Sequence, residues 1–378
     1  MTGEYRKIVI AGGGTGGHVY PALATIDALQ AENGFEFLYI GGYRGMENQI
    51  VPRTGLPFQR IVVSGWYRFL TWKNVLFPFK LILALIQSRE ILRKFKPAVV
   101  VGSGGYVSGP VVYMASKMGI PTLIEEQDSF PGLTTRLLAK YADVVCVATE
   151  HTRRFLPKVK GQLVVTGNPV RISLKRIDRS EAIRHWGLNP ERKVVFIFGG
   201  SQGAQSINQA ILEIAEHLIS RYDVQFLWQT GSKNYQKLTQ HPVTRLPEVK
   251  VLPYIERMDL AYSASDVVIS RAGAMALAEL AWAALPSILV PYPSAAGGHQ
   301  LENARRVVEA GAALLVHEGD RFSLRLSEAI GSLLEDWQWA KVMSENWKKF
   351  HRPDASRTIA QKIIELIERK YHDKIRKS

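Results

Sequence analysis

Glycine and a single histidine dominate the first stretch of this sequence that could do chemistry, AGGGTGGHVYPALA at residues 11–24. Five of the six residues from Gly12 to Gly17 are glycine, and the loop closes on His18. Such a loop between a strand and a helix can hold phosphate on its backbone N–H groups. His18 adds a side chain that exchanges a proton near neutral pH. The residues therefore predict a phosphate loop beside a candidate base, followed by a helix that opens near Pro21.

Three further segments have the same form. They are GSGGYVSGP at 102–110, FGGSQGAQSIN at 198–208 and SRAGAMALAELAWAALP at 270–286. Each places small residues before a helical pattern, and a helix N-terminus offers N–H groups and about half a positive charge. In the third segment Glu279 lies among apolar neighbours, where a carboxylate could accept hydrogen bonds from a ribose diol. The alternative for Glu279 is a solvated helix residue.

Two common nucleotide-binding patterns fit the first loop poorly. Gly12, Gly14 and Gly17 satisfy G-x-G-x-x-G, but the next apolar run, EFLYI, leads into Gly41 instead of the acid that a dinucleotide site needs. The loop also lacks the Gly-Lys-Ser/Thr ending of a Walker P-loop. Because the sequence has no H-E-x-x-H and no Asp-x-Asp pair, we expect no metal ion and no cofactor.

Short apolar runs alternate with helical patterns through both halves of the chain, which is typical of parallel βαβ units. The runs are KIVIAGG, EFLYIGG, AVVVGSGG, PTLIEEQ and DVVCVAT in the first half, and KVVFIFGG, VQFLWQTG, VKVLPY, DVVISRAG and PSILVPYP in the second. Ligands bind at the carboxyl ends of such strands, where the glycine-rich loops fall. We predict two Rossmann-like α/β domains joined near GNPVR at 167–171, and a final helix in DASRTIAQKIIELIERK.

Composition agrees with a two-domain globular protein. The chain has 378 residues, of which 46% are hydrophobic and 22% charged. The single cysteine, Cys146, excludes a disulfide framework and fits a reducing cytoplasm; we expect it in the core. No signal peptide or membrane-spanning segment is expected. The net charge of +14 predicts an anionic partner, which could be nucleic acid, lipid headgroups or a phosphorylated substrate.

Much of the positive charge lies in residues 60–97, where aromatic side chains are interleaved with basic ones and Glu90 is the only acid. Trp and Tyr favour the membrane interface, and cations favour anionic lipid. The run VLFPFKLILALI should lie among the headgroups rather than span. The alternative is a core helix with a solvated basic face; nucleic acid is disfavoured because no recognition motif occurs. The residues predicted to face the membrane are Trp66, Tyr67, Arg68, Phe69, Trp72, Lys73, Phe77, Phe79 and Lys80.

Seven segments, in order along nearly the whole chain, resemble the MurG family (glycosyltransferase family 28). They are GGTGGHVYPALA, GGYVSGP, EQDSFPGLTTRLLA, TGNPVR, GGSQGA, SRAGAMALAEL and HQLENA. The resemblance implies a GT-B fold, in which two Rossmann-like parallel-sheet domains face each other across a cleft. It implies an acceptor and membrane-facing domain over residues 1–168, a UDP-GlcNAc donor domain over 169–352 and a helix over 353–378 that packs back on the first domain.

The resemblance also implies an activity. It is the inverting, metal-independent transfer of GlcNAc from UDP-GlcNAc to the C4 hydroxyl of MurNAc in lipid I, which gives lipid II and UDP in peptidoglycan synthesis. The expected location is the cytoplasmic face of the cell membrane, as a peripheral protein. The expected partners are UDP-GlcNAc, lipid I, an anionic membrane surface and proteins of cell-wall synthesis or division, without nucleic acid.

Residue roles carry over by position. Arg171 and Ser201 match residues on the diphosphate, Ile255 matches one whose backbone reads uracil, Glu279 matches the ribose carboxylate, and Gln300 matches the glutamine on the sugar hydroxyls. The full set of predicted donor-binding residues is Thr15, Gly16, Gly17, Asp128, Arg171, Ser201, Ile255, Ala274, Met275, Ala276, Leu277, Ala278, Glu279 and Gln300.

His18 is the expected general base, with loop capping or phosphate binding as its alternative. Gly104, Gly105 and Tyr106 are expected on the acceptor side of the cleft. The chain departs from the family at residues 125–128, where it reads Glu-Glu-Gln-Asp instead of the usual His-Glu-Gln-Asn. An aspartate at the last position accepts hydrogen bonds but does not donate unless it is protonated.

Other functions stay open on the sequence alone. A UDP-GlcNAc 2-epimerase or another glycolipid synthase would share the fold, although an epimerase needs no membrane surface. A non-catalytic module that binds UDP-sugar or nucleic acid is a further alternative, against which His18 and the complete donor set argue.

Overall fold

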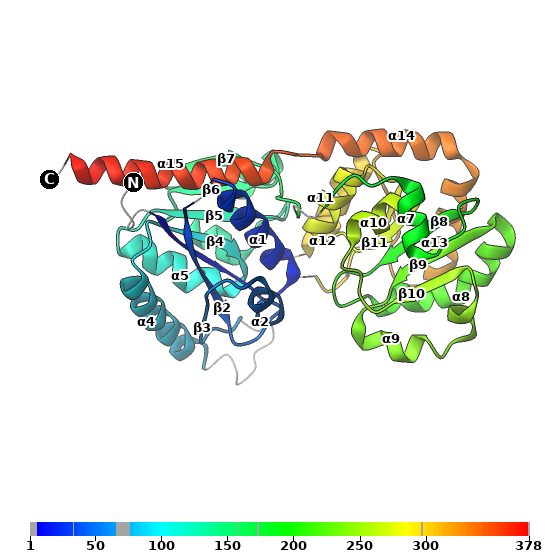
Figure 1. Ribbon diagram of the computed structural model, residues 1–378, viewed down its shortest axis with the longest axis horizontal. Coiled ribbons are helices and arrows are strands. Elements are labelled where there is room, and N and C mark those ends of the chain that lie inside the picture. Colours follow the sequence, from blue (N-terminus) through cyan, green and yellow to red (C-terminus); the bar gives the residue numbers. More distant parts are fainter. Residues whose placement is uncertain are drawn as a thin grey trace. The chain divides into compact units, whose positions relative to one another are not determined.

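The computed structural model describes residues 6–32, 34–65, 76–156, 158–171, 174–295 and 298–376. The chain divides into two compact units (Figure 1). Unit 1 comprises Met1–Arg171 and Arg352–Ser378, and unit 2 comprises Ile172–His351. Unit 1 thus runs to Arg171, beyond the boundary placed at residue 168 from the sequence, and Arg171 lies over the ring of Tyr20 in the same unit.

Unit 1 is built on a seven-stranded sheet in the order β3-β2-β1-β4-β5-β6-β7, and its paired strands are parallel. The strands are β1 Lys7–Gly12, β2 Glu36–Gly42, β3 Phe58–Ile61, β4 Val99–Gly104, β5 Thr122–Glu126, β6 Val144–Val147 and β7 Gln162–Val165. The strand order reverses between β1 and β4. The loops that follow these two strands therefore lie at the switch point where open α/β sheets bind ligands.

Helices cover both faces of this sheet. They are α1 Gly16–Gln30, α2 Glu47–Ile50, α4 Phe77–Phe95, α5 Gly105–Lys117, α6 Leu133–Leu138 and α15 Ala355–Ile375, with 3₁₀ turns η2 Val51–Thr54 and η3 Glu150–Phe155. Successive strand residues point to opposite faces. Ile8 and Cys146 accordingly join the core under α1 and α15, whereas Val9 joins the core under α4 and α5. Figure 1 shows α15 running along α1, against which it packs.

Unit 2 is built on a six-stranded sheet in the order β10-β9-β8-β11-β12-β13, again with parallel pairs. Its strands are β8 Lys193–Phe198, β9 Val224–Gln229, β10 Val249–Leu252, β11 Val267–Ser270, β12 Ser287–Leu289 and β13 Leu314–Leu315. Its helices are α7 Arg179–Trp186, α8 Gln205–Tyr222, α9 Ser232–Leu238, α10 Met258–Ala264, α11 Ala274–Ala283, α12 His299–Glu309, α13 Phe322–Glu335 and α14 Trp337–Trp347, with η4 Pro242–Arg245 and η6 Lys348–Phe350.

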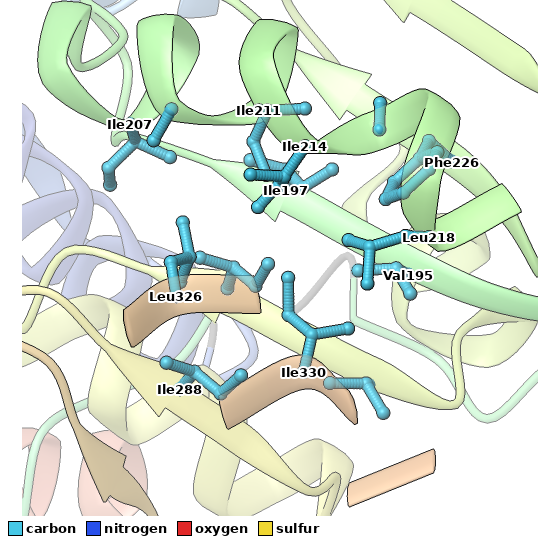
Figure 2. Close-up of a cluster of buried hydrophobic side chains, with 14 of the residues drawn as sticks. Val195, Ile197, Ile207, Ile211, Ile214, Leu218, Phe226, Ile288, Leu326 and Ile330 are labelled. Carbon is cyan, nitrogen blue, oxygen red and sulfur yellow. The ribbon is translucent and has the colours of Figure 1, made fainter. Parts of the chain in front are cut away.

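The core of unit 2 follows from helical periodicity. Ile207, Ile211, Ile214 and Leu218 recur on one face of α8 and are buried. Figure 2 shows these side chains directed toward Leu326 and others from α13 and the sheet, in one apolar cluster.

The predicted fold class, two parallel-sheet α/β domains, is confirmed. The apolar runs did not reveal β3, β7 and β13, which are edge strands of the two sheets. Edge strands are short and partly exposed, so they contain few apolar residues that could reveal them. In β3, for example, Ile61 is the one residue that is fully buried. Helix α1 begins at Gly16 rather than at Pro21, despite the poor helix propensity of the glycines, because the N–H groups of His18 and Val19 already donate to the carbonyl of Thr15.

Candidate active site

Side chains from neighbouring elements lie very close to the backbone of the first glycine-rich loop of unit 1. A Cβ atom on Gly12 would lie 2.0 Å from Oγ of Ser103, and one on Gly13 would lie 2.5 Å from the carboxyl group of Glu47. Thr15 follows as an exposed residue, and α1 starts directly after it. Only glycine allows β1, β4 and α2 to meet at this point.

Glu47 is a buried carboxylate that sequence reasoning missed. Its side chain is 0% exposed. Oε2 accepts a hydrogen bond from the N–H of Gly14 at 2.8 Å, and Oε1 accepts one from the N–H of Gly42 at 3.1 Å. Glu47 therefore ties the loop after β1 to the end of β2. No local pattern marks it, because it is a single acid in a polar segment.

His18 lies in the first turn of α1, at the carboxyl ends of the central strands. Its Nδ1 is 3.2 Å from Oε1 of Gln127, which follows β5. A Cβ atom on Gly104 would lie 2.4 Å from the same Nδ1, and one on Gly105 would lie 2.2 Å from the carbonyl oxygen of Gly13. The structure thus brings together three predicted residues, His18, Gly104 and Gly105, and adds Gln127 as a partner.

Tyr106 is the third residue predicted on the acceptor side, and its side chain is exposed. It stands in the first turn of α5 and is 56% exposed. A Cβ atom on Gly65 would lie 2.1 Å from its ring, so the tyrosine rests against the backbone there. Tyr106 can therefore offer a ring face and a hydroxyl group to a ligand of unit 1.

The two glutamates at the end of β5 point to opposite faces of the sheet. Glu125 accepts a hydrogen bond from Oγ1 of Thr25 in α1 at 3.1 Å. Glu126 points to the other face and accepts from the N–H groups of Asp128 and Gly132 at 3.0 and 2.9 Å. Burial raises the pKa of each glutamate to about 7.

Asp128, predicted to contact the donor, sits on the loop that Glu126 holds. Its backbone carbonyl accepts from Oγ1 of Thr152 at 3.3 Å. Its side chain is half-buried. The backbone on both sides of Asp128 is therefore fixed, which restricts where its carboxylate can reach.

Arg171, the predicted diphosphate ligand, stacks on α1. Its guanidinium carbon lies 4.2 Å from the centroid of the Tyr20 ring. The preceding Asn168 donates from Nδ2 to the carbonyl of Gln127 at 2.9 Å. The GNPVR segment is thus anchored to the same strand-end region of unit 1 as His18.

In unit 2 the loop after β8 forms a tight turn around Ser201. Gly200 and Gly203 have φ angles of 83° and 75°, and the N–H of Gly203 donates to the carbonyl of Gly200 at 3.0 Å. Sequence reasoning missed Gln229, which donates from Nε2 to the Gly200 carbonyl at 3.0 Å and accepts from the N–H of Ile255 at 2.8 Å. One amide thereby joins the turn that carries Ser201, through Gly200, to Ile255, the residue predicted to read the base.

Glu279 is a buried acceptor. It is 2% exposed, which contradicts the alternative of a solvated helix residue. The hydroxyl of Tyr262 in α10 donates to its Oε2 at 3.0 Å. Residues 274–278, in the first turns of α11, are half-buried and begin directly after Gly273. Tyr262 is a further residue that spacing along the chain did not reveal.

Gln300 stands in the first turn of α12. Its Oε1 accepts from the N–H of Tyr292 at 2.8 Å, which leaves the amide nitrogen to donate elsewhere. Nearby, the buried Arg271 donates to the carbonyl of Val290 at 3.1 Å and to Oγ of Ser206 at 3.0 Å. Arg271, also missed from the sequence, links the ends of β11 and β12 to the start of α8.

Three of the nine residues predicted to face the membrane lie in the described part of the chain. Phe79 is 69% exposed, whereas Phe77 and Lys80 are half-buried. The other six, Trp66, Tyr67, Arg68, Phe69, Trp72 and Lys73, lie outside the described residues. On α4 the exposed apolar side chains also include Ile82 and Ile86, at 56% and 58%. Among the described helices, none is both long and apolar enough to cross a membrane.

Comparison with known proteins places these features in a family. Residues 8–147 match the glycosyltransferase family 28 N-terminal domain, and residues 194–359 match the C-terminal domain of the same family. The two matched regions fall on the sheets of unit 1 and unit 2 respectively.

Relatives extend the match over nearly the whole chain. The UDP-N-acetylglucosamine--N-acetylmuramyl-(pentapeptide) pyrophosphoryl-undecaprenol N-acetylglucosamine transferase of Flavobacterium psychrophilum is 40% identical, covering 97% of this chain and 99% of its own. The enzyme of the same name from Moorella thermoacetica is 42% identical, covering 96% and 99%. The crystal structure of MurG from Acinetobacter baumannii is 27% identical with a TM-score of 0.75, covering 95% and 99%. The chain therefore belongs to glycosyltransferase family 28 and is a glycosyltransferase.

Proposed function

We propose that this enzyme transfers GlcNAc from UDP-GlcNAc to the C4 hydroxyl of MurNAc in lipid I, with inversion and without a metal ion. The relatives' shared name supports the donor and the acceptor. The observation that carries the proposal is the buried Glu279, held by Tyr262 in the unit that also presents Ser201. A fixed, desolvated carboxylate is a suitable acceptor for the ribose diol of a nucleotide.

The donor is held mainly by groups of unit 2. Glu279 accepts from the ribose, while Ser201 and the N–H groups at the start of α11 bind the diphosphate. The N–H of Ile255 already donates to Gln229, so the carbonyl of Ile255 is the backbone group that we expect at uracil. Gln300, oriented through its bond to Tyr292, donates from its amide nitrogen to the sugar.

His18 accepts the proton of the attacking C4 hydroxyl. The oxygen attacks the anomeric carbon from the face opposite the departing UDP, so the configuration at that carbon inverts. The negative charge that develops on UDP is stabilised by Arg171, Ser201 and the N-terminus of α11. These groups offer positive potential, and the sequence has no Asp-x-Asp pair to hold a divalent ion on the diphosphate, which is why we propose a metal-independent reaction.

Substitution of His18 tests the base. His18→Ala should lower kcat by about 10²–10⁴-fold, the usual contribution of a general base, with donor affinity nearly unchanged. The measurement is steady-state UDP release against UDP-GlcNAc concentration. His217→Ala, on the exposed face of α8, is the matched control. A near-normal kcat in His18→Ala would remove His18 from the chemical step.

The activity itself is tested by UDP release from UDP-GlcNAc in EDTA, with and without a short-chain lipid I analogue. We expect release that depends on the analogue and survives the chelator, with a β-linked disaccharide as product. Release without acceptor would favour an epimerase-type reaction. Loss of activity in EDTA that Mg²⁺ restores would contradict metal independence.

We further propose that the enzyme binds the cytoplasmic face of the membrane peripherally, because lipid I is membrane-anchored. The support is α4, where exposed Phe79, Ile82 and Ile86 lie on the same helix as the exposed cations Arg89 and Arg93. Exposed apolar side chains beside cations favour an anionic lipid surface.

A further inference from the structure

We propose that Gln127 fixes the tautomer of His18, so that the neutral imidazole carries its proton on Nδ1 and has Nε2 as its basic nitrogen. The inference deepens the proposed function, in which His18 takes the proton of the acceptor hydroxyl. Gln127 is a positioning residue in this scheme, because it acts on the substrate through His18.

The surroundings of Gln127 fix the orientation of its side-chain amide. Its Nε2 lies 3.1 Å from the backbone carbonyl oxygen of Ser103. A carbonyl oxygen only accepts hydrogen bonds, so the amide nitrogen must face it. The reversed amide would set two oxygens against each other in a buried place, since Gln127 is only 5% exposed.

This orientation of the amide nitrogen also places the amide oxygen. With Nε2 directed to Ser103, the amide oxygen of Gln127 faces Nδ1 of His18 at 3.2 Å. An amide oxygen cannot donate, so Nδ1 must carry the hydrogen of this bond. A neutral imidazole has one N–H, which makes Nε2 the nitrogen with the lone pair.

Hydrogen bonds to their backbone carbonyls hold both His18 and Gln127 in place. Oγ of Ser103 donates to the carbonyl of His18 at 2.9 Å, and Nδ2 of Asn168 donates to the carbonyl of Gln127 at 2.9 Å. Gly104 leaves room for the imidazole, because a Cβ atom there would lie 2.4 Å from Nδ1. The ends of β4 and β5 thus form a frame that determines how the ring stands.

In the proposed reaction one proton moves from the acceptor hydroxyl to His18. As the acceptor oxygen bonds to the anomeric carbon, its proton passes to Nε2 and the bond to UDP breaks with both electrons leaving on UDP. The imidazolium keeps its Nδ1–H on the Gln127 oxygen throughout. A neutral amide therefore orients the base as a carboxylate does in a Ser-His-Asp triad, but without adding negative charge.

The inference is tested separately by measuring the tautomer of His18 and by measuring turnover. In the full-length ¹⁵N-labelled enzyme, long-range ¹H–¹⁵N correlations of the His18 ring, assigned by their loss in His18→Asn, should show the proton on Nδ1 at a pH where the ring is neutral. A wild-type ring protonated on Nε2 would overturn the proposal. This measurement needs no substrate, so it stands apart from the test of the transferase activity.

Two variants extend the test. Gln127→Met keeps the length but removes the acceptor, so the His18 proton should move toward Nε2, kcat should fall at least about tenfold and the KM for UDP-GlcNAc should stay within about twofold. Gln127→Glu, if its oxygen facing the Ser103 carbonyl carries a proton, donates there as the amide does and keeps an acceptor at Nδ1, so the His18 proton should stay on Nδ1. Gln30→Met, at the exposed end of α1, is the matched control. An unchanged tautomer or unchanged kcat in Gln127→Met would overturn the positioning role.

Discussion

At the scale of single residues, protonation in unit 1 depends on burial. Glu125 and Glu126 are adjacent on β5, yet each is enclosed by a different face of the sheet. Loss of water raises the pKa of Glu125 from 4.5 to about 7, against the opposing effect of the hydrogen bond from Thr25. The protein therefore holds a proton at this position that its unfolded chain releases above the ordinary glutamate pKa.

This proton makes stability depend on pH. Between about 4.5 and about 7 the folded state binds the Glu125 proton and the unfolded state does not, so the free energy of unfolding should fall as pH rises through this window. The slope is about 1.4 kcal/mol per pH unit for each such group, and it vanishes above the folded pKa. Glu125→Gln should make the dependence shallower, leaving the share of Glu126.

Urea unfolding at about pH 5 and about pH 8 measures this difference. Glu90→Gln, on the exposed part of α4, should leave the wild-type slope intact. Equal slopes in Glu125→Gln and wild type would show that Glu125 is ionised in the folded state.

Substitutions of Glu279 and Tyr262 should weaken donor binding. Glu279→Gln removes a charged acceptor worth about 1.5–3 kcal/mol, so the KM for UDP-GlcNAc and the Kd for UDP should rise about tenfold to a hundredfold. Tyr262→Phe leaves the charge but loses the 3.0 Å bond that orients it, so its effect should be smaller. Calorimetric titration with UDP measures both, with the exposed Glu216→Gln on α8 as control. Unchanged UDP affinity in Glu279→Gln would place the ribose elsewhere.

At the scale of elements, the loop after β1 depends on a carboxylate supplied by α2. Glu47→Ala would leave the N–H groups of Gly14 and Gly42 without their acceptor, at about 1–3 kcal/mol each. The variant should lower the free energy of unfolding, and it should lower kcat because His18 follows the same loop. Denaturant unfolding and turnover are the measurements. Glu36→Ala, at the exposed start of β2, should change neither much, and equal effects of the two substitutions would contradict the role of Glu47.

In unit 2, too, a side chain from one element holds the loop that follows another. Gln229 ends β9 and bonds both to the turn after β8 and to the loop after β10. The turn that carries Ser201 is therefore held at Gly200 by an amide from a neighbouring strand.

At the scale of the whole molecule, the proposed binding to anionic lipid rests on the net charge of +14 and on the exposed apolar and basic side chains of α4. Ile82→Ser combined with Ile86→Ser should weaken binding to anionic vesicles about tenfold, which corresponds to about 1.4 kcal/mol of apolar contact. Co-sedimentation with vesicles at rising salt measures the change.

Leu324→Ser combined with Val342→Ser, which are exposed on α13 and α14, is the matched control. Turnover with a soluble short-chain acceptor should be retained in both double variants. Equal binding of the wild type to neutral and anionic vesicles would contradict an electrostatic contribution, and full binding by the α4 variant would place the membrane surface elsewhere.

Local signals in the sequence predicted part of the candidate site. His18, Ser201 and Glu279 each follow a glycine-rich or small-residue turn at a strand end, and that signal is contained in a few adjacent residues. Gln127 was visible only as a member of a motif. Its partner His18 is 109 positions away, and Glu47 contacts a loop 33 positions away, so no local period reveals either pair.

The sequence by itself determined the class of the protein, because alternating apolar runs and glycine-rich turns act within a few residues and specify parallel α/β units with phosphate-binding loops. It also predicted which loops would carry the chemistry, and those residues stay a candidate site. Only the tertiary structure decided which groups meet: strand order sets Gln127 beside His18 and Tyr262 beside Glu279. Burial then decided which acids keep their protons and which apolar residues of α4 face solvent, since desolvation depends on everything packed around a side chain rather than on its neighbours in the chain.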